Sequence, residues 1–378
     1  MRTYVLEVCL FAALLGCGAG CSRSEGDTLR GHVTAGIPIP DDALANVMEQ
    51  HLVPAVSIAV IHLGQIDWAR GYGICEQGGR KRVDSTTLFQ GASISKPVSA
   101  VGALRMVEAG TLNLDKDVND ILRSWKVPEY ESTRAEHVTV RRLLSHCAGL
   151  NVHGVPSYPS GAELPTLVQI LNGESPAYTE AIRPVFEPGK EVRYSGGGFV
   201  VLQLLMTEVA ACDFADLMGE LVLQPARMES STYKQPLPEE LRSRAAVGHL
   251  QDGSPVKGSW HTYPAQAAGG LWTNPTDMAR FIIEVWRSYH GRSEALLSQR
   301  LAQRMLTRQV GDCGLGFYLP SAGVFRFQHG GGNVGYRSYF VLSVQSGDGV
   351  VIMTNSDSGE IVIDNVFKAI AFAYGWEA

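Results

Sequence analysis

A serine and a lysine lie three residues apart in the segment FQGASISKP, residues 89–97. Ser93 precedes Lys96, and an apolar pattern typical of an amphipathic helix runs from Val98 to a glycine at position 110. Residues at i and i+3 are neighbours on one helix face, so the Ser93 hydroxyl and the Lys96 amine can meet there. The first helical turn also favours an anion and disfavours a protonated lysine. This arrangement predicts a nucleophilic serine beside its proton acceptor.

The spacing alone does not single out Ser93. A chain of this length contains about one or two Ser-x-x-Lys matches by chance. Two others occur here, at Ser231 to Lys234 and at Ser254 to Lys257. Both lie among proline, glycine and acidic residues, which are typical of loops. Only Ser93 stands at the entrance of a predicted helix, so it is the candidate nucleophile.

A tyrosine in the middle of the chain is a second candidate. Tyr194 follows a turn at residues 187–189 and precedes a helix predicted from Phe199. The glycines at 196–198 permit close approach of another backbone. Considered alone, Tyr194 also has an ordinary interpretation as a half-buried packing residue.

A glycine-rich segment near the C-terminus is a third candidate. In FRFQHGGGNVGYRSYF we expect one strand to end, the chain to run through His329 and the glycines at 330–332, and the next strand to begin. Glycines at such a strand edge let a substrate lie against main-chain N–H groups. The ordinary interpretation of His329 is a residue of a surface loop.

The elements that must position these residues come from both ends of the chain. Residues 41–52 predict a short helix, and residues 55–74 alternate as two strands joined at residues 63–65. A second predicted hairpin pairs residues 335–344 with residues 350–356, and a last helix follows. Strands at both ends around a mostly helical middle predict an α/β (α+β) fold, with one antiparallel sheet from the two termini and an inserted helical region.

The composition bounds the class of protein. The 378 residues are 45% hydrophobic and 19% charged, enough for one large or two closely associated domains. A net charge of −6 without long basic runs argues against a nucleic-acid partner, so we expect a small-molecule or peptide substrate. The ten histidines show no zinc-binding spacing, and we expect no metal or cofactor. Four cysteines are expected to be small buried residues: Cys75, Cys147, Cys212 and Cys313.

The N-terminal residues 1–21 predict an export signal. Arg2 precedes an apolar run too short to span a bilayer, and small residues follow. The sequence LLGC ending at Cys17 resembles a bacterial lipoprotein cleavage signal, and Cys21 is a second candidate. We therefore expect an exported protein of the periplasm or cell envelope, held at the membrane by a lipid on Cys17 or Cys21, with residues 22–40 as a linker. Secretion without a lipid is the alternative.

His146, in LLSHCAGL, suggests a different mechanism, a Ser-His-Asp triad completed by Asp115 or Asp117. We reject this triad because no Gly-x-Ser-x-Gly turn accompanies it. The stretch is also typical of a helix end, with Gly149 as its cap. His146 is therefore expected to be structural.

Taken together, the motifs resemble one known family. The order Ser-x-x-Lys, Tyr-Ser, His-Gly-Gly is accompanied by LFQGASISKP, RMVEAGTLNLDKDV, VTVRRLLSHCAGL, YPAQAAGGLWTNPTDMARF and HGGGNVGY. From about residue 40 to the C-terminus, the chain is similar to the β-lactamase-related serine hydrolases. That group contains class C β-lactamases, low-molecular-weight penicillin-binding proteins, D-amino-acid peptidases and family VIII carboxylesterases.

The resemblance implies a β-lactamase/transpeptidase-like fold over residues 41–378. The antiparallel sheet and its flanking helices would come from about residues 41–95 and 260–378, and the helical subdomain from about residues 96–259. The three motifs would converge on a cleft between them. It implies no cofactor.

The resemblance also implies a role for each site residue. Ser93 would attack a carbonyl and form an acyl-enzyme. Lys96 and Tyr194 would share the proton transfer, because an adjacent ammonium favours the phenolate form of a tyrosine, and we name them as a pair. The backbone N–H groups of Ser93 and Gly332 would form the oxyanion hole. His329 would hydrogen-bond the Tyr194 region or the substrate.

Two departures from the family pattern bear on the substrate. The second motif commonly runs Tyr-x-Asn, whereas this chain has Gly196 two residues after Tyr194. His329 stands where many relatives carry lysine, and histidine attracts a carboxylate less at neutral pH. We therefore expect an exported carboxylesterase- or peptidase-like hydrolase. A class C type β-lactamase and a catalytically weak binding protein that retains the fold are the alternatives.

Overall fold

The computed structural model of the chain describes residues 41–130 and 136–376. The expected export signal at residues 1–21, with Cys17 and Cys21, and the expected linker at residues 22–40 lie outside the described residues. The description below concerns the unit that begins at α1 (Asp41–Gln50).

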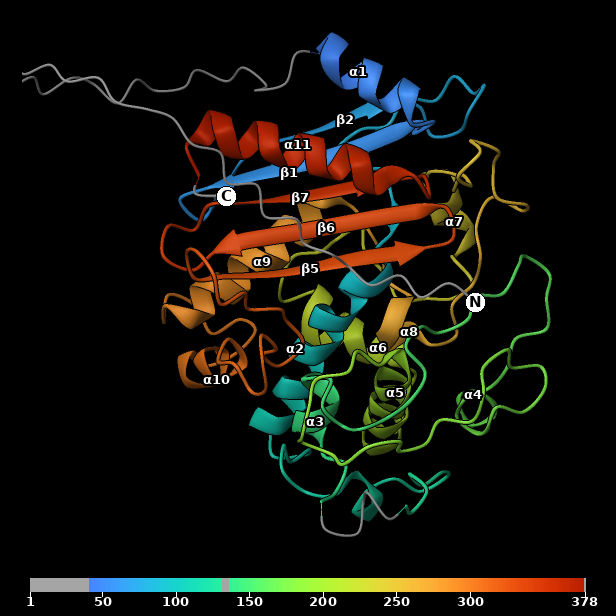
Figure 1. The fold of residues 1–378 in the computed structure, drawn as a ribbon, viewed down its shortest axis with the longest axis vertical. Helices are drawn as coiled ribbons and strands as arrows, with labels where there is room; N and C mark the ends of the chain where they lie inside the picture. Colours follow the sequence, from blue (N-terminus) through green and yellow to red (C-terminus); the bar gives the residue numbers. More distant parts are fainter. Residues whose placement is uncertain (1–40, 131–135, 377–378) are drawn as a thin grey trace, which may run out of the picture. The chain divides into compact units, whose positions relative to one another are not determined.

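A five-stranded antiparallel sheet joins the two ends of the described chain (Figure 1). Its order is β2-β1-β7-β6-β5. The strands are β1 (Ala55–His62), β2 (Gln65–Gly73), β5 (Arg326–Asn333), β6 (Tyr336–Ser343) and β7 (Gly349–Thr354). This arrangement confirms the predicted antiparallel sheet built from both termini.

The central strands are apolar because both faces of the sheet are covered. Side chains alternate along a strand, so Val56 and Ile58 of β1 face a cluster with α11 (Gly359–Tyr374). Ala59 of β1 faces the main core instead. On that side α9 (Pro275–Tyr289) packs against β1 and β7, while α11 covers the opposite face (Figure 1).

The inserted region is mostly helical and contributes the larger part of the core. It comprises η1 (Ala92–Ile94), α2 (Ser95–Glu108), η2 (Val118–Asp120), α3 (Val140–Leu144), α4 (Leu167–Asn172), α5 (Gly196–Ala210), α6 (Phe214–Met218), η4 (Gly219–Leu223), α7 (Glu239–Arg242) and α8 (Gln266–Gly269). The short strands β3 (Phe89–Gln90) and β4 (Trp272–Thr273) pair with each other, and α10 (Gln299–Met305) precedes β5. Within the described residues no single helix is long and apolar enough to cross a membrane, and only the bent pair Gly196–Ala210 and Phe214–Leu223 reaches that length and composition.

The glycine-rich segment differs from its prediction as a connection between two strands. His329 and the glycines at 330–332 lie inside β5 and pair with residues of β6. Glycine has a low preference for strands, so the sequence suggested that the strand ended earlier. The ladder with β6 holds the segment extended.

The cysteines outside the N-terminal segment are free in this structure. Cys75, Cys147 and Cys313 are buried, as expected, but Cys212 is exposed, contrary to the expectation. Cys212 stands just after the C-cap of α5, where the chain turns toward α6. Across the described residues no group of histidine, cysteine and acidic side chains could hold a metal ion.

Candidate active site

Ser93 lies in η1, the short helical turn directly before α2. The preceding Ala92 is fully buried and has a φ of +52°, a left-handed conformation that is uncommon for a residue with a side chain. Ser95 holds this turn in place, since its hydroxyl donates to Ala92 O at 2.5 Å and accepts from the Leu271 N–H at 3.0 Å. The result is a fixed turn that leaves Ser93 half-buried at the edge of a cavity.

Lys96 meets Ser93 across one turn, as the i and i+3 spacing predicts. Lys96 Nζ donates to Ser93 Oγ at 3.1 Å and to Ala268 O at 2.7 Å. Its side chain is only 2% exposed. The same nitrogen lies 4.9 Å from the centre of the Tyr194 ring and 5.6 Å from that of Phe199. The amine is therefore held by two hydrogen bonds against two aromatic faces.

Tyr194 stands one residue before the N-cap of α5. The Ser195 hydroxyl caps that helix by accepting from the Gly198 N–H at 3.0 Å, and it donates to Asn151 O at 2.8 Å. The cap fixes the loop that carries Tyr194. Lys96 Nζ lies over the face of the Tyr194 ring, and among the described residues the Tyr194 hydroxyl has no hydrogen-bond partner.

Two histidines that the sequence did not place at the site flank Tyr194. The ring centres of His146 and His153 lie 4.4 Å and 4.8 Å from that of Tyr194. His146 is buried with a φ of +55°, and its Nδ1 accepts the Ser195 N–H at 3.2 Å. Burial, together with the nearby charge of Lys96, holds the pKa of His146 well below its ordinary value. His146 is thus a neutral support for the Tyr194 loop.

The rejected triad does not form. The Asp115 carboxylate accepts two hydrogen bonds from Arg141, at 2.6 Å and 2.8 Å. The Asp117 carboxylate accepts from the Asn119 N–H at 2.9 Å and lies 3.2 Å from His137. Neither acid is engaged with His146, whose Nδ1 already has a backbone donor.

His329 faces the same group of rings from β5. Its Nδ1 donates to Gly330 O at 2.6 Å, so Nε2 is left as an acceptor, and that atom is buried without a partner. Its ring centre lies 6.5 Å from that of Tyr194 and 5.4 Å from that of Tyr318. Burial first, and the Lys96 charge second, lower the pKa of His329 to about 3. His329 is therefore neutral at physiological pH.

The free edge of β5 presents main-chain groups to the cavity. Gln328 and Tyr318 exchange two backbone hydrogen bonds of 3.0 Å, so the backbone of Gln328 points away from β6. Because the direction alternates along a strand, the N–H of Gly332 points to the same outer edge. Gly332 and Ser93 line the same cavity. Their N–H groups are candidates for the oxyanion hole.

Gly331 explains how β5 comes so close to the nucleophile. A Cβ atom at this position would lie 2.7 Å from Gly91 O and 2.9 Å from Ser93 N, inside contact distance. Ser338 of β6 reinforces the contact by donating from its hydroxyl to Gly91 O at 2.7 Å. The glycine is thus required for close packing of the strand against η1.

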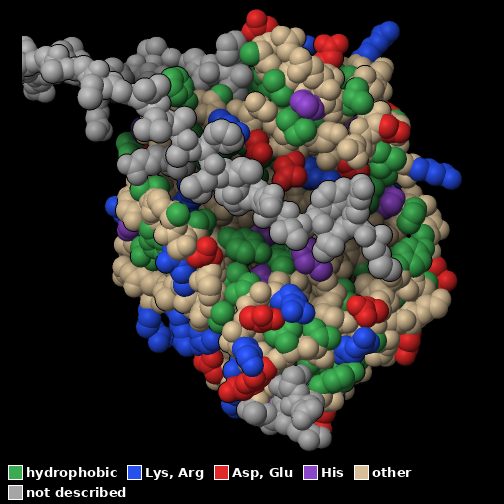
Figure 2. Space-filling model, viewed as in Figure 1, with side chains coloured by type: hydrophobic (Ala, Val, Ile, Leu, Met, Phe, Trp, Pro, Cys, Tyr) green, Lys and Arg blue, Asp and Glu red, His purple; other side chains and the backbone are tan. Residues whose placement is uncertain are grey.

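The cavity consists of two adjoining hollows of about 770 Å³ and about 510 Å³. Both are lined by Ser93, His153, Gly154, Tyr194, Gly332 and Arg337. The larger hollow extends to His329 and α11, and the smaller one to Lys96 and Tyr263. Figure 2 shows histidine side chains near the centre of this face, between the sheet and the helical layer. The structure therefore brings Ser93, Lys96, Tyr194, His329 and Gly332 together around one cavity.

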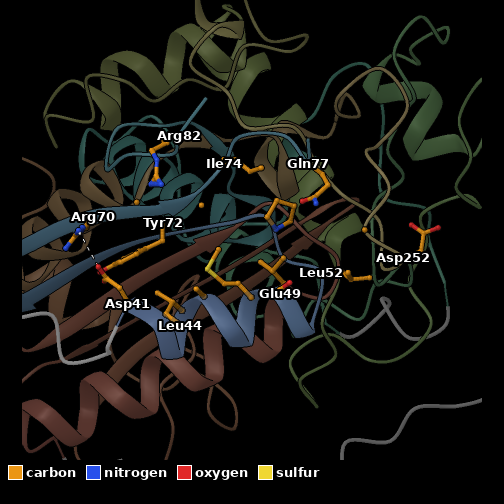
Figure 3. A pocket seen from close by; sticks show the side chains of 17 residues that line it. Asp41, Leu44, Glu49, Leu52, Arg70, Tyr72, Ile74, Gln77, Arg82 and Asp252 are labelled. Carbon is orange, nitrogen blue, oxygen red and sulfur yellow. Dashed lines mark ion pairs between the residues drawn. The ribbon is translucent and has the colours of Figure 1, made fainter. Parts of the chain in front are cut away.

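A further cavity of about 800 Å³ lies between α1 and the edge strand β2 (Figure 3). Asp41 and Arg70 face each other across it with a 3.9 Å ion pair. Its wall contains none of the predicted site residues. The cavity beside α1 therefore does not carry the candidate chemistry.

The chain matches the family model described as Beta-lactamase over residues 40–371. Penicillin-binding protein 4 of Amycolatopsis lactamdurans is 26% identical over 344 residues, which cover 85% of this chain and 86% of that protein. The chain spans 63% of the length of a further relative, Protein flp of Staphylococcus aureus.

Two solved structures have the same fold. The octameric penicillin-binding protein homologue from Pyrococcus abyssi superposes with a TM-score of 0.71 at 22% identity, covering 89% of this chain and 77% of that one. EstCE1, a hydrolase with promiscuous acyltransferase activity, superposes with a TM-score of 0.68 at 21% identity, covering 86% and 98%. The β-lactamase/transpeptidase-like fold is thereby confirmed.

Proposed function

The chain belongs to the Beta-lactamase family, a family of serine hydrolases, and on this premise we propose that it cleaves ester or amide bonds through an acyl-enzyme on Ser93. The observation that carries the proposal is the 3.1 Å hydrogen bond between Lys96 Nζ and Ser93 Oγ at the edge of a cavity. A buried amine in contact with a half-exposed hydroxyl is the arrangement that an activated serine needs.

The mechanism follows from this contact. Ser93 Oγ attacks the carbonyl carbon of the substrate, and the hydroxyl proton passes to the adjacent pair of Lys96 and Tyr194. The N–H groups of Ser93 and Gly332 stabilise the negative oxygen of the tetrahedral intermediate. Collapse breaks the bond to the leaving alcohol or amine, which takes up the proton. Water then attacks the acyl carbon, the ester bond to Ser93 Oγ breaks as this oxygen takes up a proton from the water, and the carboxylic acid is released.

Three features favour an ester or peptide over a β-lactam. His329 is neutral, because its pKa is lowered to about 3, and offers no charge to a carboxylate. The Ser195 hydroxyl caps α5 and donates to Asn151 O, so it is not free to bond a β-lactam. Gly196, where relatives commonly carry asparagine, has no side chain to hold an amide carbonyl. A class C type β-lactamase remains the second candidate because its acylation machinery would be the same.

A substrate panel tests the proposal. We expect kcat/KM for a short-chain p-nitrophenyl ester to exceed that for a chromogenic cephalosporin by about tenfold or more, which corresponds to about 1.4 kcal/mol and the loss of one charge-assisted hydrogen bond. A D-Ala-D-Ala peptide completes the panel, and mass spectrometry locates each acyl group on the protein. A faster cephalosporin would indicate a β-lactamase. Absence of turnover and of fluorophosphonate labelling would indicate a binding protein.

We also propose that the protein is exported and anchored by a lipid on Cys17, or else on Cys21. Acyl chains on that cysteine would be the anchor. In a bacterial host, Cys17→Ala is expected to move the protein from the membrane fraction to the soluble exported fraction, as followed by fractionation and immunoblotting. Release by Cys21→Ala alone would assign the lipid to the second cysteine, and no release by either change would remove the lipoprotein proposal.

A further inference from the structure

The wall that α11 contributes to the active-site cavity carries two carboxylates. Glu360 and Asp364 both line the hollow of about 770 Å³ that contains Ser93. They lie four residues apart and thus on one face of the helix, and the apolar Ile363 and Phe367 line the same hollow. Figure 2 shows acidic side chains on this face near α11. Both acids are exposed, and neither has an ion-pair or side-chain hydrogen-bond partner among the described residues.

The cations of the cavity already have partners. Arg337 Nη1 donates to Asp357 Oδ1 at 3.0 Å, and to the backbone oxygens of Asn333 and Tyr336 at 2.9 Å and 2.8 Å. Lys96 is bonded to Ser93 Oγ and to Ala268 O. Glu360 and Asp364 therefore leave negative charge on the cavity wall that no lysine or arginine of the described chain pairs with.

A buried acceptor in the same hollow independently indicates a ligand that donates a hydrogen bond. His329 is 3% exposed, and its Nε2 is an acceptor without a partner because Nδ1 donates to Gly330 O. A buried acceptor that lacks a donor is costly, so a ligand that supplies an N–H group would be stabilised there. Two carboxylates and one imidazole nitrogen of this hollow are thus hydrogen-bond acceptors without a protein donor among the described residues.

We propose that the substrate carries a protonated amine, which binds against Glu360 and Asp364 while its alkyl portion contacts Ile363 and Phe367. The inference rests on the proposed hydrolase function and names the substrate class of that site. Ammonium groups supply both the positive charge and the N–H donors that this wall lacks. A substrate with a carboxylate at the same place would be repelled.

The test uses three p-nitrophenyl esters that differ only in the end of a six-carbon acyl chain: 6-aminohexanoate, hexanoate and hydrogen adipate. At pH 7 these ends are positive, neutral and negative. We expect kcat/KM for the amine to exceed that for hexanoate by about tenfold, since two exposed carboxylates each contribute a few fold, and adipate to be slowest. Acetate esters of 6-aminohexanol, hexanol and 6-hydroxyhexanoate, followed by released acetate, place the same three ends on the leaving side.

Matched variants assign the preference to α11. Glu360→Gln combined with Asp364→Asn is expected to bring the amine-to-neutral ratio close to one, whereas Glu49→Gln, an exposed acid of α1 at the cavity in Figure 3, leaves the ratio unchanged. Hydrolysis of hexanoate without any preference for the amine in either series, or a preference that survives the double change, would overturn the inference. If none of the six esters is hydrolysed and Ser93 is not labelled, the proposed function itself fails.

Discussion

Ser93→Ala is expected to abolish turnover, with a loss of about 10⁴-fold or more in kcat/KM for a p-nitrophenyl ester, because no acyl-enzyme can form. The fold should remain intact, since Ser93 is half-buried and, within the part of the chain that the structure describes, its hydroxyl is bonded only to Lys96. Ester hydrolysis and fluorophosphonate labelling are to be measured together with thermal unfolding. Activity of wild-type magnitude in a folded Ser93→Ala protein would assign the nucleophile to another residue.

The serines of the other two Ser-x-x-Lys matches serve as controls for Ser93→Ala, and the two control variants are expected to differ in stability. Neither Ser231 nor Ser254 lies in a helix, as predicted from their surroundings. The Ser254 hydroxyl bonds to the exposed Asp252 at 2.6 Å, so Ser254→Ala should leave activity and stability unchanged. The Ser231 hydroxyl instead donates to Asp277, which is 2% exposed, at 2.8 Å. Ser231→Ala should keep activity and lower the free energy of unfolding by about 1–2 kcal/mol.

Local patterns were sufficient for much of the fold. The apolar run of β1 and the turn at Leu63-Gly64 predicted the first hairpin, because strand alternation and turn residues act over a few positions. The same reasoning placed β6, β7 and α11. β5 was only partly predicted, since its glycines disfavour a strand. Its extended form depends on pairing with β6 and on contact of Gly331 with Gly91 and Ser93, which no local pattern encodes.

In the site too, arrangements set by neighbouring residues could be predicted, whereas contacts between distant segments could not. Ser93 and Lys96 could be paired from the sequence because three residues on a helical turn fix their separation. The position of Lys96 over the face of Tyr194 could not be predicted from the sequence, because it depends on how α2 and α5 pack. His146 was expected to be structural, but its contact with Tyr194 depends on the path of the chain after α3. A histidine in a short loop carries no local signal for such a contact.

Lys96→Met is expected to reduce kcat/KM for an ester by about 10³-fold and to suppress fluorophosphonate labelling of Ser93, because it removes the amine that contacts the nucleophile. Methionine nearly fills the buried space of the lysine chain, so the fold should persist. Tyr194→Phe keeps the ring between His146 and His153 and removes a hydroxyl that has no partner here. In this variant kcat/KM should fall by only about tenfold, and fluorophosphonate should still label Ser93.

The comparison of these two variants identifies the group that takes the first proton. If Tyr194 is that group, Tyr194→Phe will lose as much activity as Lys96→Met and will fail to label. The pH profile adds an independent readout. Burial lowers the pKa of His146 well below its ordinary value and brings that of His329 to about 3, so both rings are neutral near pH 7. A fall in kcat/KM that begins near pH 7 therefore does not arise from either of these two rings. If it disappears in Tyr194→Phe, the fall depends on the tyrosine. If it persists there, which is the result we expect, the remaining groups beside Tyr194 are Lys96 and His153, and the loss of Ser93 labelling in Lys96→Met then assigns the first proton to Lys96.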